Sequence, residues 1–439
     1  MMNFITDDTA IFLAVKDHIP HYEEYIDLDC DKDHSLAFMG LMQDIHTASP
    51  KHRIDITQAP YFCKKETICT AGIQKALDDC TDKDVVVIPA GTYYTGALCL
   101  HSDTELLVEE DGVLQGTAEP ADYEPRILSR FEGKERMCYQ SLLNIGTLDH
   151  TSGPNVHNVY IHGKGKIMGG GFELAKKCAA IEKENLKDYL ASHPEEVASC
   201  ENENTIPFRC RGRLVNLSNA ENVVIKDLTL GQGPSWNIHM IYSRNILLSD
   251  CRIESEGIWN GDGIDPDSSE NIWIENCSFH TGDDAVAIKA GKNPEGNVIN
   301  RPTRNVVVDH CVSDYGHGIC IGSEMSGGVE NVMINDCDME VSECGIEIKA
   351  TKKRGGFVRN VYVRHTTAPC VQIHSVGYND DGEGAKTLPV LEHFSFEDMT
   401  LTGKTCNLDH EWKTCDPINL RFDPSSCLHD VTVNGKKYL

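Results

Sequence analysis

The sequence of 439 residues is poor in basic side chains. Lysine and arginine together number 40, against 68 aspartates and glutamates, so the formal net charge is −28 at pH 7. A surface of this sign repels backbone phosphates, which argues against a nucleic-acid-binding protein. An acidic ligand would have to be held by local basic residues against the overall field.

Long apolar runs are also missing, and none approaches the roughly 18 to 20 residues of a membrane span. The first residues, Met1 to Asp8, lack the basic segment, apolar core and cleavage site of a signal peptide. The 19 cysteines include no Cys-x-x-Cys pair and form no compact framework. These features predict a thiol-rich cytoplasmic protein that has no membrane partner.

What is present is a short internal repeat of the form Asn, apolar, x, apolar, x, x, Cys. Full copies begin at Asn245, Asn271, Asn305 and Asn331, and weaker copies begin at Asn158, Asn222 and Asn360. A unit of 23 to 34 residues without a helix cannot bury its apolar face alone, so it must stack on its neighbours. The repeat therefore predicts an all-β fold, a single-stranded right-handed parallel β-helix with adjacent coils about 4.8 Å apart.

The same repeat predicts two internal stacks of side chains. The cysteines that end the four full copies are Cys251, Cys277, Cys311 and Cys337. We expect them to stack as small apolar residues, because cysteine buries well as a small hydrophobe. A metal site or disulfides are the alternative. The asparagines should form a second stack at a turn, with side chains bonded to backbone groups of the next coil.

The segments around the repeat suggest the domain organisation. Residues 1–62 are expected to form an N-terminal module or cap of unclear fold, and residues 63–439 the β-helix. Within the latter, residues 70–79 predict a short amphipathic helix. An insertion at about 169–204 is rich in helix formers. It can only project from a β-helix as a groove wall or a subunit contact, which leaves a homo-oligomer open.

Acidic clusters flanked by glycine lie on successive copies of the repeat. The polar segments are, in chain order, Asn260-Gly-Asp262, Gly282-Asp-Asp284, Gly316-His-Gly318 and Glu347-Ile-Lys349. Because successive coils lie side by side, we expect Asp262, Asp283, Asp284, His317 and Lys349 to converge on one groove. Carboxylates this close cannot all ionise freely. One protonated acid beside ionised neighbours is the arrangement that glycoside hydrolysis needs.

These four segments, in this order, resemble the motifs of glycoside hydrolase family 28, the polygalacturonases and their relatives. The resemblance covers roughly residues 65–400 and extends to the segment 233–239. The segments 260–266 and 322–328, and the lack of a signal peptide, look more like the bacterial exo-acting branch. The resemblance implies a pectin-lyase-like β-helix and an inverting glycosidase that cleaves terminal residues from pectin-derived oligosaccharides. It implies no cofactor and no metal.

The resemblance also implies roles for the site residues. Asp283 is the general acid, and Asp262 and Asp284 position and deprotonate a water on the opposite face. His317 helps to set the protonation of the acid, and Lys349 binds a uronate carboxylate. The further candidate substrate contacts are Asn260, Trp236 and Lys289. Trp236 is equally compatible with core packing.

Glu347 departs from the family pattern, since polygalacturonases carry an arginine there that grips a galacturonate carboxylate. A glutamate would repel that carboxylate. Either Glu347 points away, paired with Lys349 or Arg354, or the subsite holds a different sugar. A basic cluster could supply another clamp, although such clusters are usually solvated; it comprises Lys289, Lys292, Lys349, Lys352, Lys353 and Arg354.

Several alternatives stay open on these residues. The substrate could be a rhamnogalacturonan fragment or a rhamnoside with a neutral sugar in the site. A calcium-dependent pectate-type lyase on the same fold would place calcium on the acidic cluster. A non-catalytic β-helix binding protein is disfavoured, because sugar grooves favour aromatics over carboxylates. His239, Asp265 and Asp267 are expected to be structural, whereas Glu324, Arg211 and Arg213 are weaker candidates for the site.

Overall fold

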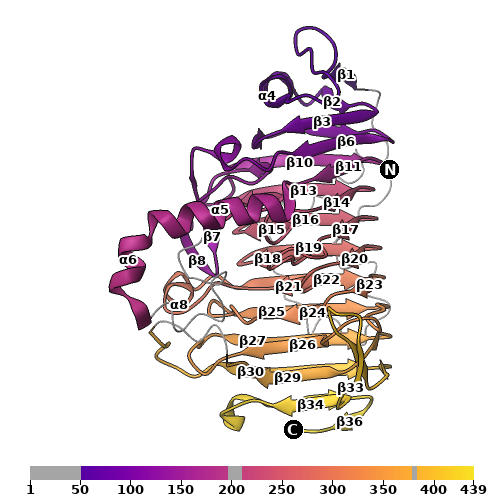
Figure 1. Cartoon of the computed structure of the whole chain (residues 1–439). Coiled ribbons are helices and arrows are strands. Elements are labelled where there is room, and N and C mark those ends of the chain that lie inside the picture. Colours follow the sequence, from indigo (N-terminus) through magenta and orange to yellow (C-terminus); the bar gives the residue numbers. More distant parts are fainter. Residues whose placement is uncertain (1–50, 196–209, 378–382) are drawn as a thin grey trace.

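The structure is a computed structural model that describes residues 51–195, 210–377 and 383–439. These residues form a right-handed parallel β-helix, in which three long sheets run the length of the stack (Figure 1). Successive coils add parallel strands to these sheets in turn, as the repeat predicts, and the 7-stranded sheet ends at residue 315. The predicted fold class is therefore confirmed.

The strands are distributed over the three sheets as follows. The 13-stranded sheet contains β1 (His52–Asp55), β2 (Asp84–Ile88), β5 (Glu105–Val108), β10 (Val156–Gly163), β13 (Ala220–Lys226), β16 (Arg244–Ser249), β19 (Glu270–Glu275), β22 (Thr303–Asp309), β25 (Val329–Asn335), β27 (Phe357–Arg364), β30 (Val390–Glu397), β35 (Val431–Val433) and β36 (Lys436–Lys437). The 7-stranded sheet contains β3 (Gly91–Thr95), β6 (Gly112–Gly116), β11 (Lys166–Met168), β14 (Thr229–Gly231), β17 (Arg252–Glu254), β20 (Ser278–His280) and β23 (Val312–Tyr315). The 10-stranded sheet contains β4 (Leu98–Leu100), β9 (Leu143–Ile145), β12 (Val215–Ser218), β15 (Ile238–Ile241), β18 (Ile264–Asp267), β21 (Val286–Ile288), β24 (Gly318–Ile321), β26 (Gly345–Ala350), β29 (Val371–Ser375) and β34 (Ile418–Arg421).

Shorter elements lie outside the three long sheets. The two-stranded sheets pair β7 (Ile127–Phe131) with β8 (Lys134–Cys138), β28 (Thr367–Ala368) with β31 (Thr400–Leu401), and β32 (Lys404–Cys406) with β33 (Trp412–Thr414). The helices are α4 (Thr70–Asp79), α5 (Gly171–Asn185), α6 (Lys187–Ser192) and α8 (Glu295–Ile299), with 3-10 turns η2 (Pro120–Tyr123) and η4 (Ser425–Cys427). Among the described residues, no helix is long and apolar enough to cross a bilayer.

The apolar positions of the repeat build the core, because parallel register stacks equivalent residues on one another. Ile246 pairs with Ile272, Ile272 with Val306, and Val306 with Val332. All four side chains are buried. Each coil thus covers the apolar face of the next, which is why no single repeat needs to fold alone.

The predicted cysteine stack is present inside the coils. Cys251, Cys277, Cys311 and Cys337 are buried free thiols, and each donates to a backbone carbonyl two residues back at 3.2 to 3.3 Å. Every other cysteine in the described residues is also a free thiol. The apolar packing interpretation is therefore favoured over disulfides.

The asparagines also stack, and their side chains are bonded to one another. Along the stack each side chain donates to the side chain of the preceding asparagine, as in Asn271 to Asn245 and Asn305 to Asn271, both at 3.0 Å. The ladder runs from Asn360 back to Asn158, which donates to Asp103. These asparagines have φ between 55° and 58°. That left-handed turn points every amide along the helix axis, so neighbouring amides meet each other.

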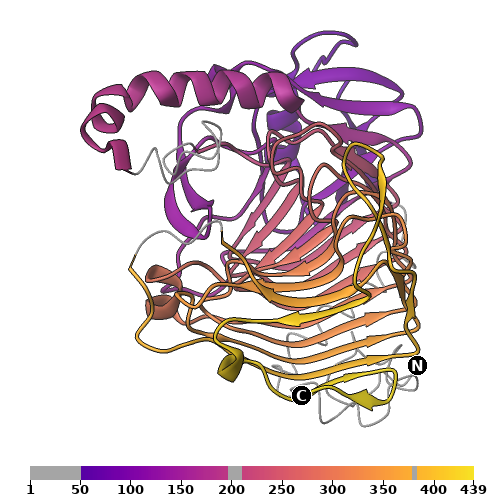
Figure 2. The same cartoon turned by 60° about the horizontal axis from the view of Figure 1, so that its bottom comes forward.

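The ends of the β-helix and the insertion extend the sequence predictions. The predicted helix at 70–79 is α4, which buries Ile73, Ala76 and Leu77. Strand β1 pairs in parallel with β2, so the 13-stranded sheet begins before residue 63. Residues 1–50 of the expected leading module lie outside the described residues. The helical insertion is present as α5 and α6, which lie along the outside of the coils (Figure 2). Its part beyond residue 195 is likewise outside the described residues.

Candidate active site

The predicted polar residues lie at the bend where each coil turns from the 7-stranded into the 10-stranded sheet. Asp262 precedes β18, Asp283 and Asp284 precede β21, and His317 precedes β24. Lys349 lies within β26, the next strand of the same sheet. Parallel register places these strands side by side, so residues up to 87 positions apart in sequence meet in one place.

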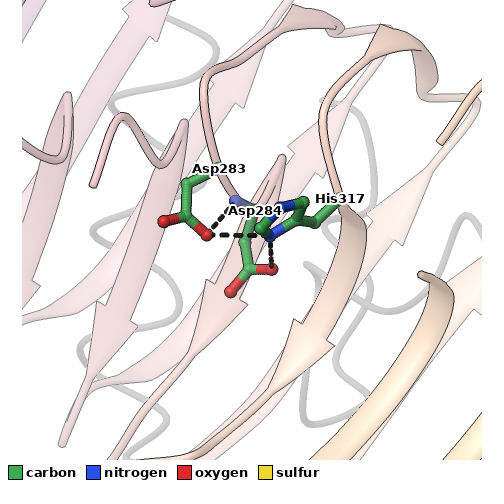
Figure 3. Close-up of side chains that lie close together, drawn as sticks. All are labelled: Asp283, Asp284 and His317. Carbon is green, nitrogen blue, oxygen red and sulfur yellow. Dashed lines mark hydrogen bonds and ion pairs between the residues drawn. The ribbon is translucent and has the colours of Figure 1, made fainter. Parts of the chain in front are cut away.

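The acid predicted from the sequence, Asp283, is paired with His317 (Figure 3). Its Oδ1 lies 2.9 Å from His317 Nδ1, and its side chain is 25% exposed, so it remains accessible to solvent. Burial disfavours the imidazolium, but the carboxylates of Asp283 and Asp284 outweigh it and raise the pKa of His317 well above its usual value. The pair therefore holds a proton at the groove surface.

Asp284 is the buried member of this cluster. Its Oδ2 lies 3.1 Å from Lys349 Nζ, and its Oδ1 lies 3.5 Å from His317 Nδ1. Burial alone would raise the pKa of Asp284, but Lys349 and His317 hold it far below the usual range. Asp284 is consequently a fixed negative charge beneath the more exposed Asp283.

Asp262 has a different environment on the preceding coil. Its side chain is buried, and its Oδ2 lies 3.6 Å from Lys289 Nζ. Burial, together with the negative charges of Asp265 and Asp283, raises the pKa of Asp262 well above the usual range. Asp262 and Asp284 thus differ in protonation because each has its own neighbours, and such differences allow neighbouring carboxyl groups to take distinct roles.

Lys289 is placed differently from a substrate-binding lysine. Its ammonium group lies 3.6 Å from Asp262, 3.6 Å from Asp265 and 3.3 Å from Glu324. Only 5% of the residue is exposed. These carboxylates outweigh burial and raise the pKa of Lys289 well above its usual value. Lys289 is therefore a buried counter-ion for the acids.

Trp236 is packed rather than open to the groove. Lys289 Nζ lies 4.4 Å from the ring centre and Arg213 Cζ lies 4.2 Å from it, so two cations contact the indole. His239 makes an edge contact with the ring at 4.8 Å. The residue is 3% exposed, which favours the core interpretation over a sugar platform.

Glu347 is paired with neighbours in its own sheet, which agrees with the expectation that it pairs with Lys349. Its carboxylate lies 3.2 Å from Lys349 Nζ and 2.6 Å from His374 Nε2. Burial opposes ionisation, but Lys349 and His374 lower the pKa of Glu347. Arg354 is not its partner: that guanidinium is buried and donates to Ser323 O and Asn293 Oδ1.

The wider basic clamp does not form as one cluster. Lys289 and Arg354 are buried in the contacts given above, whereas Lys352 is exposed and Lys353 half-buried. Asn260 is half-buried and accepts a hydrogen bond from Arg211 Nη2 at 3.1 Å. Of the expected clamp, Lys349 contacts Asp284 and Lys289 contacts Asp262.

The β7–β8 hairpin contributes residues that the sequence analysis did not identify. It reaches along the coils toward α8 (Figure 1), where Lys292 N donates to Gly133 O at 2.9 Å. Arg130 of β7 is buried and lies 2.6 Å from Asp267 Oδ1. Burial and the nearby Glu324 raise the pKa of Glu132 at the hairpin tip. The Glu132-Gly133 pair between two short runs is a hairpin signal that could have found this element.

The same acids could in principle hold a cation, as a calcium-dependent lyase would require. Donor atoms of Asp283, Asp284 and His317 lie within 4.8 Å of one another. However, His317 and Lys349 already supply positive charge to both carboxylates. Calcium prefers six to eight oxygen ligands. The arrangement fits proton transfer better than calcium binding.

Comparison with known proteins assigns the family. The profile described as "Glycosyl hydrolases family 28" matches residues 129–369, more than half of the chain. The chain belongs to this family. The match contains all four polar segments, so the resemblance predicted from them is confirmed.

Individual relatives carry polygalacturonase names. The chain is 29% identical over 361 residues to a "Probable polygalacturonase" of Vitis vinifera, covering 79% of this chain and 66% of that protein. It is 26% identical to an "Exo-poly-alpha-D-galacturonosidase" of Dickeya chrysanthemi, covering 82% of this chain and 62% of the relative. Each match thus spans slightly less than two thirds of the relative. The exopolygalacturonase structure from Thermotoga maritima shares the fold, with a TM-score of 0.67, 22% identity and coverage of 91% of this chain and 97% of that one.

Proposed function

We propose that this family 28 protein is an inverting glycosidase that removes terminal galacturonate residues from pectin-derived oligosaccharides. The observation that carries the proposal is the distinct environment of each acid. Asp284 is held ionised by Lys349, Asp283 is paired with His317, and Asp262 stands on the preceding coil beside Lys289. A single-displacement glycosidase needs this division between a proton donor and a base.

The chemistry follows from these positions. Asp283 protonates the glycosidic oxygen, and the bond from that oxygen to the anomeric carbon breaks. Asp262, with Asp284, takes a proton from a water whose oxygen bonds to the opposite face of the same carbon, so the configuration inverts. This requires roughly 6.5 to 9.5 Å between the carboxyl groups of acid and base. His317 returns a proton to Asp283 after the leaving sugar departs.

The proposal of terminal cleavage is supported by the β7–β8 hairpin. It packs against two different coils of the site. Gly133 O accepts from Lys292 N, which follows β21, and the guanidinium of Arg213, which precedes β12, lies 4.8 Å from the Phe131 ring. We expect this hairpin to close one end of the site and so to leave room for a short glycone only. The exo-acting names of the Dickeya and Thermotoga proteins agree with this proposal.

A second candidate differs in the sugar on the leaving-group side. The acid Asp283 lies between the base coil and the coils that carry His317 and Lys349, so the leaving sugar faces those later coils. There the charge of Lys349 is already shared by Asp284 and Glu347. This charge balance favours a neutral leaving sugar, such as the rhamnose of a rhamnogalacturonan fragment, over a second galacturonate.

A substrate panel tests both candidates. We expect release of galacturonate from defined galacturonan or rhamnogalacturonan oligosaccharides, with the inverted anomer seen first by NMR. Asp283→Asn should abolish release while circular dichroism shows an unchanged β-fold. Near-normal turnover by that variant, or initial release of the retained anomer, would contradict the mechanism. The preferred oligosaccharide decides between the two leaving sugars.

We also propose that the enzyme acts in the cytoplasm on imported oligosaccharides. The support is that the cysteines in the described residues are free thiols, which a reducing compartment maintains. Cell fractionation with an antibody tests this, and recovery of the protein in the culture medium would contradict it.

A further inference from the structure

Asp265 lies three residues after Asp262 and has no assigned role. It belongs to β18, in register with His239 of β15, and it is fully buried. Neither of its carboxylate oxygens has a hydrogen-bond donor among the described residues, and Asp262 Oδ1 lacks one too. Buried oxygens without a donor are costly, so three of them on two acids that both lie 3.6 Å from Lys289 Nζ require an explanation.

The charged groups around the two acids do not provide that explanation. Lys289 Nζ lies 3.6 Å from each of them, beyond hydrogen-bond range, and is closer to Glu324 at 3.3 Å. The other charged groups that face Asp265 are Arg213, which favours its ionisation, and Asp284, which opposes it. Lys289 is shared by three buried carboxylates, and neither Lys289 nor Arg213 donates a hydrogen bond to Asp265.

We propose that Asp265 and Asp262 share one proton in the resting enzyme, and that Asp265 is a positioning residue for the base Asp262. The Asp265 hydroxyl donates to the Asp262 carboxylate. This hydrogen bond supplies one of the missing donors and removes one buried charge. It leaves two carboxylates, which Lys289 and the neighbouring cations Arg213 and Lys292 can balance. A carboxylic acid kept neutral by burial so that it can donate is an established catalytic device.

The electrostatics agree with a shared proton. Burial raises the pKa of Asp265 to about 8, and burial together with Asp265 raises the pKa of Asp262. Below about pH 8 the pair should therefore retain a proton and titrate as a unit. During the reaction Asp265 keeps this proton while Asp262 accepts one from the attacking water. Asp262 then releases that second proton to solvent after the product leaves.

Infrared spectroscopy tests the shared proton without any substrate. The difference spectrum of wild type minus Asp265→Asn at pH 6 should show the C=O stretching band of a carboxylic acid. Glu324→Gln is the matched control, because Glu324 also contacts Lys289 and has a lowered pKa from Lys289 and Lys292 despite burial. Its difference spectrum should show loss of a carboxylate band only. No acid band in the Asp265→Asn difference would overturn the proposal.

Kinetics test the positioning role, which rests on the proposed hydrolysis. Asp265→Asn keeps a donor of similar shape, whereas Asp265→Leu removes it. We expect Asp265→Leu to lower kcat by about 10²- to 10³-fold with little change in KM, the usual effect of losing one such donor. Asp265→Asn should retain kcat within about tenfold and lose the decline of kcat/KM near pH 8. Equal activity of two folded variants would overturn the role. If the wild type hydrolyses none of the oligosaccharides in the panel, the proposed function is wrong. The infrared spectra still test the shared proton, because they need no substrate.

Discussion

Removing Lys349 should leave the buried negative charge of Asp284 without its lysine partner. The two groups lie 3.1 Å apart, with side chains 9% and 3% exposed. At an effective dielectric constant of about 20, their attraction is about 5 kcal/mol. Loss of one partner of such a buried pair costs about 3–5 kcal/mol of folding stability, because the other charge is left uncompensated. Glu347 is less affected, since His374 still contacts it at 2.6 Å.

A double-mutant cycle measures this cost. Lys349→Met should lower the free energy of unfolding in urea by about 3–5 kcal/mol. Adding Asp284→Asn should restore most of it, because no buried charge remains, yet hydrolysis should stay abolished. Asp284→Asn alone should cost less than Lys349→Met, since Lys349 keeps Glu347 at 3.2 Å. A loss below about 1 kcal/mol for Lys349→Met, or no recovery in the double variant, would refute the ion-pair argument.

Three further predictions address other contacts of the site. The pKa of His317 is raised in the folded protein. Its contribution to folding stability is therefore complete below about pH 6.5 and is lost as pH rises through the folded-state pKa. NMR should find the imidazolium at pH 7, and the pKa of His317 should fall in Asp283→Asn. Arg130→Met should lower stability by about 3–5 kcal/mol in urea unfolding, because it leaves Asp267 buried and ionised; a cost below about 1 kcal/mol would mean that the hairpin contact is not stabilising. Glu347→Arg should raise kcat/KM for galacturonan relative to rhamnogalacturonan oligosaccharides, since an arginine can grip a carboxylate at two points; an unchanged ratio would remove Glu347 from substrate selection.

The repeat made both the fold and the position of the acids predictable from the sequence. Parallel stacking places residues that are one repeat apart in the sequence next to each other. The proximity of Asp262, Asp283, His317 and Lys349 could therefore be predicted from the sequence. The helix at 70–79 and the cysteine stack were predictable for the same reason: both depend on local apolar periodicity. Even the ladder of asparagines was foreseen as a stack, although its partners were not.

Only the tertiary structure decided the environment of each group. The contact of Arg130 with Asp267 joins residues 137 positions apart, and the hairpin that makes it lies outside the repeat. The burial of Lys289 and Trp236, the pairing of Glu347 with His374, and the lack of a donor for Asp265 also depend on such contacts. A repeat determines which residues are neighbours along the stack. Whether a carboxyl group among them is ionised depends on the water, charges and donors around it, which are set by side chains that converge from distant coils.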